Sequence, residues 1–230
     1  MDSTELARFT DFLDVLSEIK KGDIVLFRGQ SANHPLLPKI ARADPTRDTT
    51  QLEKVMLTEL RRRGTLHIDT RLNDQWDMLV LAQHYGMATR LLDWTSNPLV
   101  ALWFACVGSK PRASSYVYVF LAEQEFLLDR EKTPDPFRPM KTRVFKPNLN
   151  NPRIVAQSGW FTAHRYSTKV KRFVALEKNT ELKRSLIEIK VPPRLREDIL
   201  VHLDTLGISY QSMFPDIEGV CRHLNWLHEA

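Results

Sequence analysis

Residues 81–106 read LAQHYGMATRLLDWTSNPLVALWFAC, the most informative run of the chain. Residues 99–107 are almost wholly apolar and follow Ser96-Asn97-Pro98, where Ser or Asn is a favoured helix cap and Pro a favoured first residue. This predicts a central, buried helix. The polar residues lie among Leu, Ala, Trp and Phe, so their dry polar atoms must be hydrogen-bonded. The run is therefore either a hydrogen-bonded core or a binding site.

Individual polar residues of this run have both a structural and a functional interpretation. For His84 we favour a hydrogen-bonded core histidine over a ligand-binding group. Arg90 and Asp93 are predicted to form a buried ion pair that rigidifies a turn. Thr95 and Ser96 are predicted mainly as helix caps, although hydroxyls and free N–H groups at a helix N-terminus also suit an anionic ligand.

The segment before this run contributes a strand that ends in an arginine. Residues 4–19, which follow a Ser-Thr cap, have apolar residues at helical spacing and predict an amphipathic helix. Residues 24–27 predict a short buried strand, directly followed by Arg28-Gly29-Gln30. The planar fork of an arginine at a strand end either binds a phosphate or carboxylate or pairs with a core acid, and the sequence leaves both open.

Two more helices are predicted before residue 90. Thr50 and Glu53 form an expected capping box that begins the first, after an irregular stretch over residues 31–48. The other spans residues 74–85 and is closed by Gly86.

The second half is richer in strands. Strands are predicted at residues 115–121, 152–157, 173–177 and 185–191. A loop is expected over residues 133–151, a helix between Pro192-Pro193 and Gly207, and a last helix that contains Val220. Helices mostly first and strands later predict a single α+β domain rather than a doubly wound sheet.

Composition excludes several classes of protein. The 230 residues include only 8 glycines, and none of them forms a G-x-G-x-x-G or G-x-x-x-x-G-K-[ST] motif, so any nucleotide must be held by side chains. A net charge of +5 permits a polyanionic partner. Cys106 and Cys221 lack C-x-x-C spacing, which predicts a reducing, cytoplasmic location. Without a long apolar run we expect no membrane partner.

Two later segments repeat the mixture of polar and aromatic residues. Residues 153–164, RIVAQSGWFTAH, place Gln157 and His164 beside aromatic rings that would suit a stacked base or nicotinamide, although strand packing explains the rings equally well. Residues 213–219, MFPDIEG, place Asp216 and Glu218 at a helix start, where they offset the helix dipole or orient a ligand hydroxyl.

The sequence contains only a weak indication of a metal-binding site. Cys221-x-His223 is an isolated pair, and H-E-x-x-H is missing, so no metal site is predicted. Asp93, Asp216 and Glu218 would hold Mg²⁺ for a nuclease only if they converge.

Together these segments resemble a known family. Phe27-Arg28-Gly29, AQHYG-x-x-TRLLDWT-x-NP-x-x-AL-x-FA, Arg153-x-x-x-Gln157-x-Gly159-x-Phe161-Thr162-x-His164 and FPD-x-[DE]-G look like the FRG domain of bacterial and phage proteins. The resemblance runs from about Gly22 to Leu224. It implies an FRG domain over residues 22–230, with residues 1–21 as an N-terminal helix packed on it.

The chain is more distantly similar to the arginine-serine-glutamate class of ADP-ribosyltransferases. That class has an aromatic-Arg-Gly strand end, a hydroxyl tripeptide before a V-A-x-x-F helix, and a late catalytic glutamate. Here Phe27-Arg28-Gly29 and residues 93–104 are similar to the first two. The resemblance implies a split, mainly antiparallel sheet and NAD as co-substrate. It places Arg28 on the NAD phosphates, Thr95 and Ser96 near the nicotinamide ribose, and Glu218 at the ribosyl cation.

The expected catalytic residues are Glu218, His84 and Arg28. The residues expected to bind NAD are Arg28, Gly29, Gln30, Gln83, His84, Thr95, Ser96, Asn97, Gln157, Phe161 and His164. The leading hypothesis is an NAD-cleaving enzyme or toxin of bacterial or phage conflict that transfers ADP-ribose to a protein, a nucleic acid or water. The alternatives are a non-catalytic nucleotide or nucleic-acid binding module and a metal-dependent nuclease.

Overall fold

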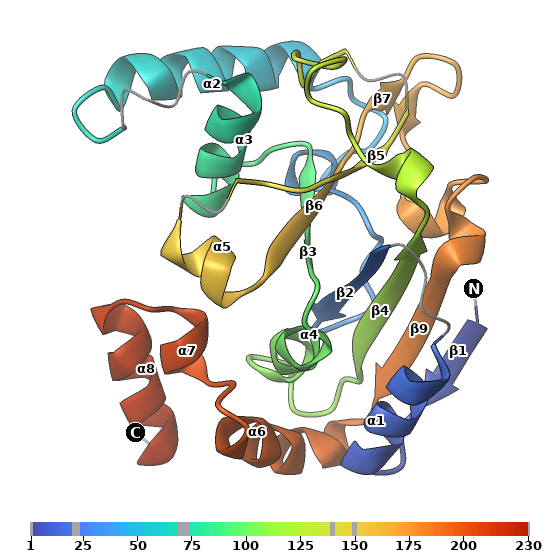
Figure 1. The fold of residues 1–230 in the computed structure, drawn as a ribbon, viewed down its shortest axis with the longest axis vertical. Coiled ribbons are helices and arrows are strands. Elements are labelled where there is room, and N and C mark those ends of the chain that lie inside the picture. The colour runs from blue at the N-terminus through green and yellow to red at the C-terminus, as the bar shows by residue number, and fades with distance from the viewer. Residues whose placement is uncertain (1, 20–23, 69–73, 139–140, 149–150, 230) are drawn as a thin grey trace.

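The computed structural model describes residues 2–19, 24–68, 74–138, 141–148 and 151–229. These form an α+β domain around a sheet of seven strands in the order β1-β9-β4-β2-β3-β6-β5 (Figure 1). The strands are β1 (Asp2–Glu5), β2 (Ile24–Gln30), β3 (Leu91–Thr95), β4 (Ser115–Ala122), β5 (Arg143–Phe145), β6 (Gly159–Ala163) and β9 (Leu186–Val191). Within this sheet, β1 and β9 are parallel and the other neighbours antiparallel. A small ladder joins β7 (Tyr166–Ser167) to β8 (Arg172–Phe173). The α+β class and the mainly antiparallel sheet are confirmed.

The sheet is split between β2 and β3. Strand β2 pairs with β4 along its whole length, and β3 pairs with β6 from Leu91 to Thr95. Between β2 and β3 themselves, the described residues pair only where Phe27 lies opposite Thr95. Beyond that pair the described residues of the two strands form no ladder, so the sheet consists of two half-sheets.

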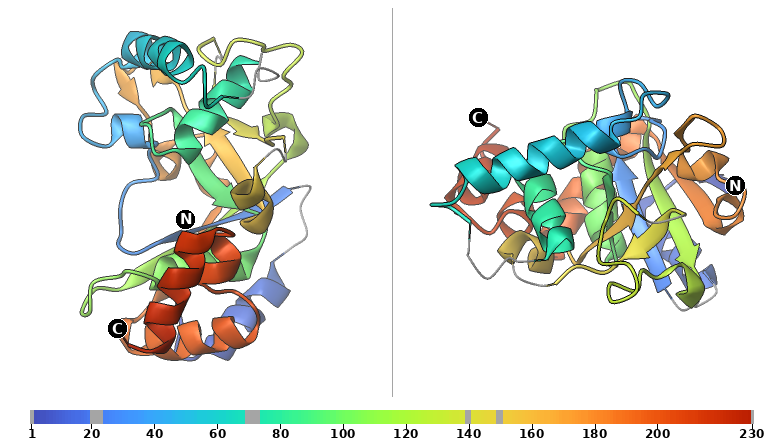
Figure 2. Two further views of the ribbon diagram at one scale, coloured as in Figure 1. Left: turned by 90° about the vertical axis from the view of Figure 1, so that its left-hand side faces the viewer. Right: turned by 90° about the horizontal axis from the view of Figure 1, so that it is seen from above.

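Helices pack around both halves. They are α1 (Phe9–Glu18), α2 (Thr50–Arg63), α3 (Gln75–His84), α4 (Pro98–Cys106), α5 (Pro152–Ala156), α6 (Arg196–Thr205), α7 (Tyr210–Met213) and α8 (Ile217–Leu227). Short 3-10 helices lie at Lys39–Ala41, Gln124–Phe126, Leu176–Lys178, Lys183–Ser185 and Pro193–Leu195. Figure 2 shows α2 and α3 at one end of the molecule and α6, α7 and α8 at the other.

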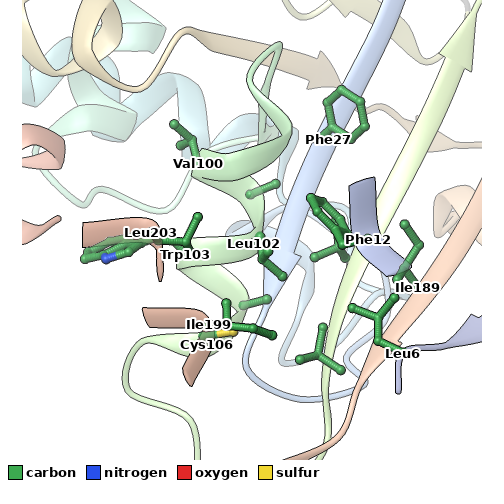
Figure 3. Close-up of a cluster of buried hydrophobic side chains, with 14 of the residues drawn as sticks. Leu6, Phe12, Phe27, Val100, Leu102, Trp103, Cys106, Ile189, Ile199 and Leu203 are labelled. Carbon is green, nitrogen blue, oxygen red and sulfur yellow. The ribbon is translucent and has the colours of Figure 1, made fainter. Parts of the chain in front are cut away.

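The predicted central helix is α4. The Asn97 side chain caps it by accepting hydrogen bonds from the N–H groups of Leu99 and Val100. Its apolar residues enter a core with Phe12 of α1, Phe27 of β2 and residues of α6 (Figure 3). Gly29 permits this packing, because a Cβ there would lie 1.9 Å from the carbonyl oxygen of Ala101. The glycine of the Phe-Arg-Gly motif is therefore required where β2 crosses α4.

The structure corrects the predicted start of the chain. Residues 2–5 form β1 beside β9, so the Ser-Thr cap was wrong and the helix begins only at Phe9. The Asp11 carboxylate caps α1 instead, by accepting the backbone N–H groups of Ala7 and Arg8 at 2.9 Å.

Three more predicted elements, two strands and a turn, also need correction. Residues 152–156 form α5, because Pro152 follows an Asn151 cap, and the strand of this region is β6. The turn expected around Asp93 is β3, whose burial on the sheet outweighs local turn signals. In the segment 173–177 the strand stops at Phe173 and a 3-10 helix follows.

Other predicted elements are confirmed, including the helices ending before Gly86 and Gly207, whose φ values are 84° and 82°. The loop predicted over residues 133–151 contains β5, and its residues 139–140 and 149–150 lie outside the described part. Cys106 and Cys221 are free thiols, in α4 and α8. Across the described ranges, no helix has the length and apolar character needed to cross a membrane.

Candidate functional site

A cleft with a volume of about 460 Å³ opens where the two half-sheets separate. It is lined by the end of β2, by β3 and the start of β6, and by residues of α3, α4 and α5. Because side chains alternate along a strand, consecutive lining residues such as Phe27 and Arg28 come from opposite faces of the sheet. The cleft therefore passes through the split.

Arg28 is the central cation of this cleft. Its Nη1 donates a 2.7 Å hydrogen bond to the backbone carbonyl of Asp93 and lies 3.7 Å from the Asp93 carboxylate. The side chain is only 14% exposed, and its buried Nε has no hydrogen-bond partner among the described residues. Burial, opposed by Asp93 and assisted by Arg42, lowers the pKa of Arg28 to about 10, so it is protonated at neutral pH. Arg28 therefore meets an acid, as one of the two sequence interpretations predicted, and it does so inside a cleft. Its binding of a ligand phosphate or carboxylate stays a prediction.

Asp93 is held by an amide rather than by Arg90. Gln83 Nε2 donates to both carboxylate oxygens at 3.1 Å, and Gln83 Oε1 accepts a 2.6 Å hydrogen bond from the Thr89 hydroxyl. The Thr89 bond fixes which end of the amide faces Asp93. The carboxylate is still 54% exposed.

Arg90 instead pairs with Glu53, so the predicted Arg90–Asp93 pair and the Thr50–Glu53 capping box were both wrong. Arg90 Nε lies 2.8 Å from Glu53 Oε2, the Arg90 backbone N–H donates to Oε1 at 2.6 Å, and both side chains are buried. The ring of Phe137 packs against the guanidinium at 4.4 Å. Burial raises the pKa of Glu53 although Arg90 opposes this. The pair ties α2 to the start of β3.

Thr95 and Gln157 connect the end of β3 to the residue that follows α5. The Thr95 hydroxyl donates to the carbonyl of Gln157 at 2.7 Å and accepts the backbone N–H of Asn97 at 3.0 Å. The amide of Gln157 donates to the carbonyl of Met213 at 3.0 Å. Both residues line the cleft, whereas Ser96 and Asn97 lie outside its lining.

His164 belongs to a buried series of hydrogen bonds that begins at Trp94 of the cleft lining. The Trp94 indole N–H donates to the Thr162 hydroxyl at 3.1 Å, and that hydroxyl lies 3.0 Å from His164 Nε2. Since the hydroxyl oxygen accepts from Trp94, its hydrogen is free to bond His164. Burial lowers the pKa of His164 to about 3, so the ring is neutral. His164 lies outside the cleft lining, so it orients Trp94 rather than meeting a ligand.

The far end of the cleft is aromatic and charged. The guanidinium of Arg153 lies 4.8 Å from the ring centre of Phe214 and forms a 2.9 Å ion pair with Asp216. His84 lines this end, and its pKa is lowered by burial and by Arg153, against the effect of Asp216. This cluster joins α3 and α5 to the start of α8.

Glu218 does not reach the cleft. Its carboxylate is 59% exposed and pairs with Arg222 at 2.5 Å along α8. Asp216 caps α8 by accepting the N–H of Gly219, and neither Asp216 nor Glu218 is among the residues that line the cleft with Asp93. The convergence required for a magnesium nuclease does not occur, and no group of three metal-ligating side chains is found in the described ranges.

Eight of the predicted ligand-binding residues thus share one cleft. They are Arg28, Gly29, Gln30, Gln83, His84, Thr95, Gln157 and Phe161. Sequence reasoning did not assign a ligand to Arg42, Arg153, Phe104 or Phe214, which also line it. Arg153 and Phe214 stand inside the quoted motifs, but Arg42 comes from the irregular stretch and carries no local signal.

The comparisons identify part of this chain. Residues 23–114 match the family model described as FRG domain, which covers β2, β3 and α4. No curated protein and no solved structure matches the chain.

Proposed function

Residues 23–114 of this chain belong to the FRG domain family, and on that premise we propose that the cleft binds NAD and that the protein is an NAD-cleaving, ADP-ribosyltransferase-like enzyme. The observation that carries the proposal is the environment of Arg28. A buried, protonated guanidinium with an unused N–H at the fork of a split sheet needs an anionic acceptor.

The neighbours of Arg28 support a phosphate-bearing ligand. Gln30, two residues along β2 and on the same face, is buried and also has an Nε2 without a hydrogen-bond partner. Arg42 lines the same part of the cleft, close enough to lower the pKa of Arg28. Two unused donors and two cations suit phosphate oxygens, and the chain lacks a glycine-rich loop to bind them otherwise.

The aromatic lining supports a ligand that also contains rings. Phe104, Trp160, Phe161 and Phe214 line the cleft, whose volume lies within the usual range of about 300–1,000 Å³ for small-molecule sites. A nucleotide combines phosphates with an aromatic ring and therefore fits this lining. The split sheet and the Phe27-Arg28-Gly29 strand end favour NAD among nucleotides, through the resemblance stated above.

Binding is tested by titrating NAD into the wild type and into Arg28→Gln, with calorimetry at fixed ionic strength. A charge-assisted hydrogen bond is worth about 1.5–3 kcal/mol, so we expect Arg28→Gln to bind about 10- to 100-fold more weakly. Arg62→Gln, which removes an exposed arginine on α2 outside the cleft lining, is the matched control and should bind as the wild type does. Equal affinity of Arg28→Gln and the wild type would refute the assignment.

The position of Glu218 favours a second candidate, a module that binds a nucleotide without cleaving it. The late glutamate expected to assist the reaction is exposed on α8 and outside the cleft. Incubation with NAD alone and with cell extract, followed by measurement of free nicotinamide and of labelled protein or nucleic acid, separates the two. Thermal stabilisation by NAD without nicotinamide release would support the binding module.

A further inference from the structure

We propose that Asp93 is the catalytic carboxylate of this cleft, in the role that the sequence resemblance gave to Glu218. This inference rests on the proposed binding of NAD. Among the described residues that line the cleft, Asp93 is the only acid, and it stands on β3 at the split.

The presence of Asp93 needs an explanation because the cleft is otherwise cationic. Arg28, Arg42 and Arg153 line it, and a carboxylate beside them weakens the attraction for a purely anionic ligand. A half-exposed carboxylate in such a place is useful to a ligand that carries a positive part as well as phosphates. NAD meets this requirement during cleavage, when positive charge develops at its ribosyl carbon.

The contacts of Asp93 keep its charge available. Its oxygens accept from the neutral amide of Gln83 at 3.1 Å, while the nearest guanidinium nitrogen of Arg28 lies 3.7 Å from Oδ2 and directs its short hydrogen bond to the backbone carbonyl. The Thr89–Gln83 bond holds the amide in this orientation. A carboxylate fixed in advance on a rigid strand stabilises a developing cation without reorganising.

Asp93 and Arg28 also lie close enough together to contact the same ligand. The carbonyl of Asp93 bonds Arg28, so the phosphate-binding cation and the carboxylate meet at one residue. Both side chains line the cleft, so one ligand can contact the guanidinium and the carboxylate together. Glu218 lacks any such relation to the cleft.

The step assigned to Asp93 is the cleavage of the bond between ribose C1′ and the nicotinamide nitrogen. The bonding electron pair leaves with nicotinamide, which becomes neutral, and the positive charge moves to C1′ and the ribose ring oxygen. The Asp93 carboxylate stabilises this cation electrostatically. A lone pair of water or of an acceptor then bonds C1′, and the attacking group releases its proton to solvent.

The test compares Asp93→Asn with Glu218→Gln, two carboxylate-to-amide changes, one in the cleft and one outside it. Nicotinamide release is measured under single turnover and NAD affinity by calorimetry, with urea unfolding as a check on folding. We expect Asp93→Asn to release nicotinamide on the order of 10²–10³-fold more slowly and to bind NAD as tightly as the wild type or more tightly. We expect Glu218→Gln to match the wild type in both.

The possible outcomes distinguish the assignment of Asp93 from the proposed binding of NAD. Release by Asp93→Asn at the wild-type rate, or loss of release only in Glu218→Gln, overturns the assignment of Asp93. A wild type that binds NAD but releases no nicotinamide also overturns it, while leaving NAD binding intact. Failure of the wild type to bind NAD overturns the proposed function itself. If Asp93→Asn is unfolded, Asp93→Ser takes its place, because it also removes the charge and leaves a hydroxyl beside the Gln83 amide, and it should slow release to a similar extent.

Discussion

Replacement of Gly29 by alanine tests how the split sheet is built. A Cβ at this position would lie 1.9 Å from the carbonyl oxygen of Ala101 and 2.5 Å from the backbone nitrogen of Ala105. Ordinary contacts begin near 3.4 Å, so β2 and α4 would have to separate by about 1.5 Å. Both opposing atoms belong to the backbone of a buried helix, and no side chain is available to rotate away.

The expected cost follows from this geometry. Overpacking a core costs about 1–3 kcal/mol, and a clash with rigid backbone on both sides belongs at the upper end. We therefore expect Gly29→Ala to lower the free energy of unfolding by about 3 kcal/mol. For a chain of this length that corresponds to a fall in melting temperature of about 6–12 °C.

The assay is urea unfolding followed by circular dichroism, with Gly159→Ala as the matched control. Gly159 is also a strand glycine of the cleft lining, but its added Cβ would meet atoms of Ile154 no closer than 3.4 Å, which is ordinary van der Waals contact. The control should stay within about 1 kcal/mol of the wild type, since alanine also restricts the unfolded chain. If Gly29→Ala unfolds at the same urea concentration as Gly159→Ala, the close approach of β2 to α4 is not what requires glycine.

Three further predictions concern the buried polar groups. Glu53→Gln should lower the free energy of unfolding by about 3–5 kcal/mol in urea titrations, because it leaves the buried Arg90 without a counter-charge, and an unchanged midpoint would contradict this. Thr162→Val should cost about 1–3 kcal/mol in the same assay, since Trp94 and His164 both lose a partner; a neutral effect would mean that the chain of hydrogen bonds is unimportant. His164 has a folded-state pKa of about 3 against an ordinary 6.5, so the unfolded state binds the extra proton and stability should fall as the pH falls from 6.5 toward 3. This part of the pH dependence should disappear in His164→Gln, and its persistence there would assign it to other groups.

Local sequence patterns determined much of the secondary structure. The Asn97-Pro98 start and the apolar residues after it predicted α4 correctly, because capping and helix propensity act within a few residues. The same holds for β4 and β9, whose β-branched and aromatic residues mark them. Local patterns failed at residues 2–5 and 91–95, which are strands only because a neighbouring strand supplies their hydrogen bonds.

In the candidate site, too, the sequence determined some features and the tertiary structure determined others. The sequence alone identified Arg28, Gln83, Thr95 and Gln157 as polar residues in apolar surroundings, which needed partners or a ligand. Which residue partners which was decided by the tertiary structure. Arg90 meets Glu53, from a helix far away along the chain, and Asp93 is left facing Arg28 across the split.

The choice of acid illustrates the physical reason. Chain order made Glu218 the expected catalytic glutamate, but α8 directs it to solvent beside Arg222, while Asp93 lies in the cleft. Charge and residue type can be read from a sequence, because they are properties of single residues. The distance between two carboxylates and one arginine depends on how β2, β3 and α8 pack, and that packing is determined only when the whole core is formed.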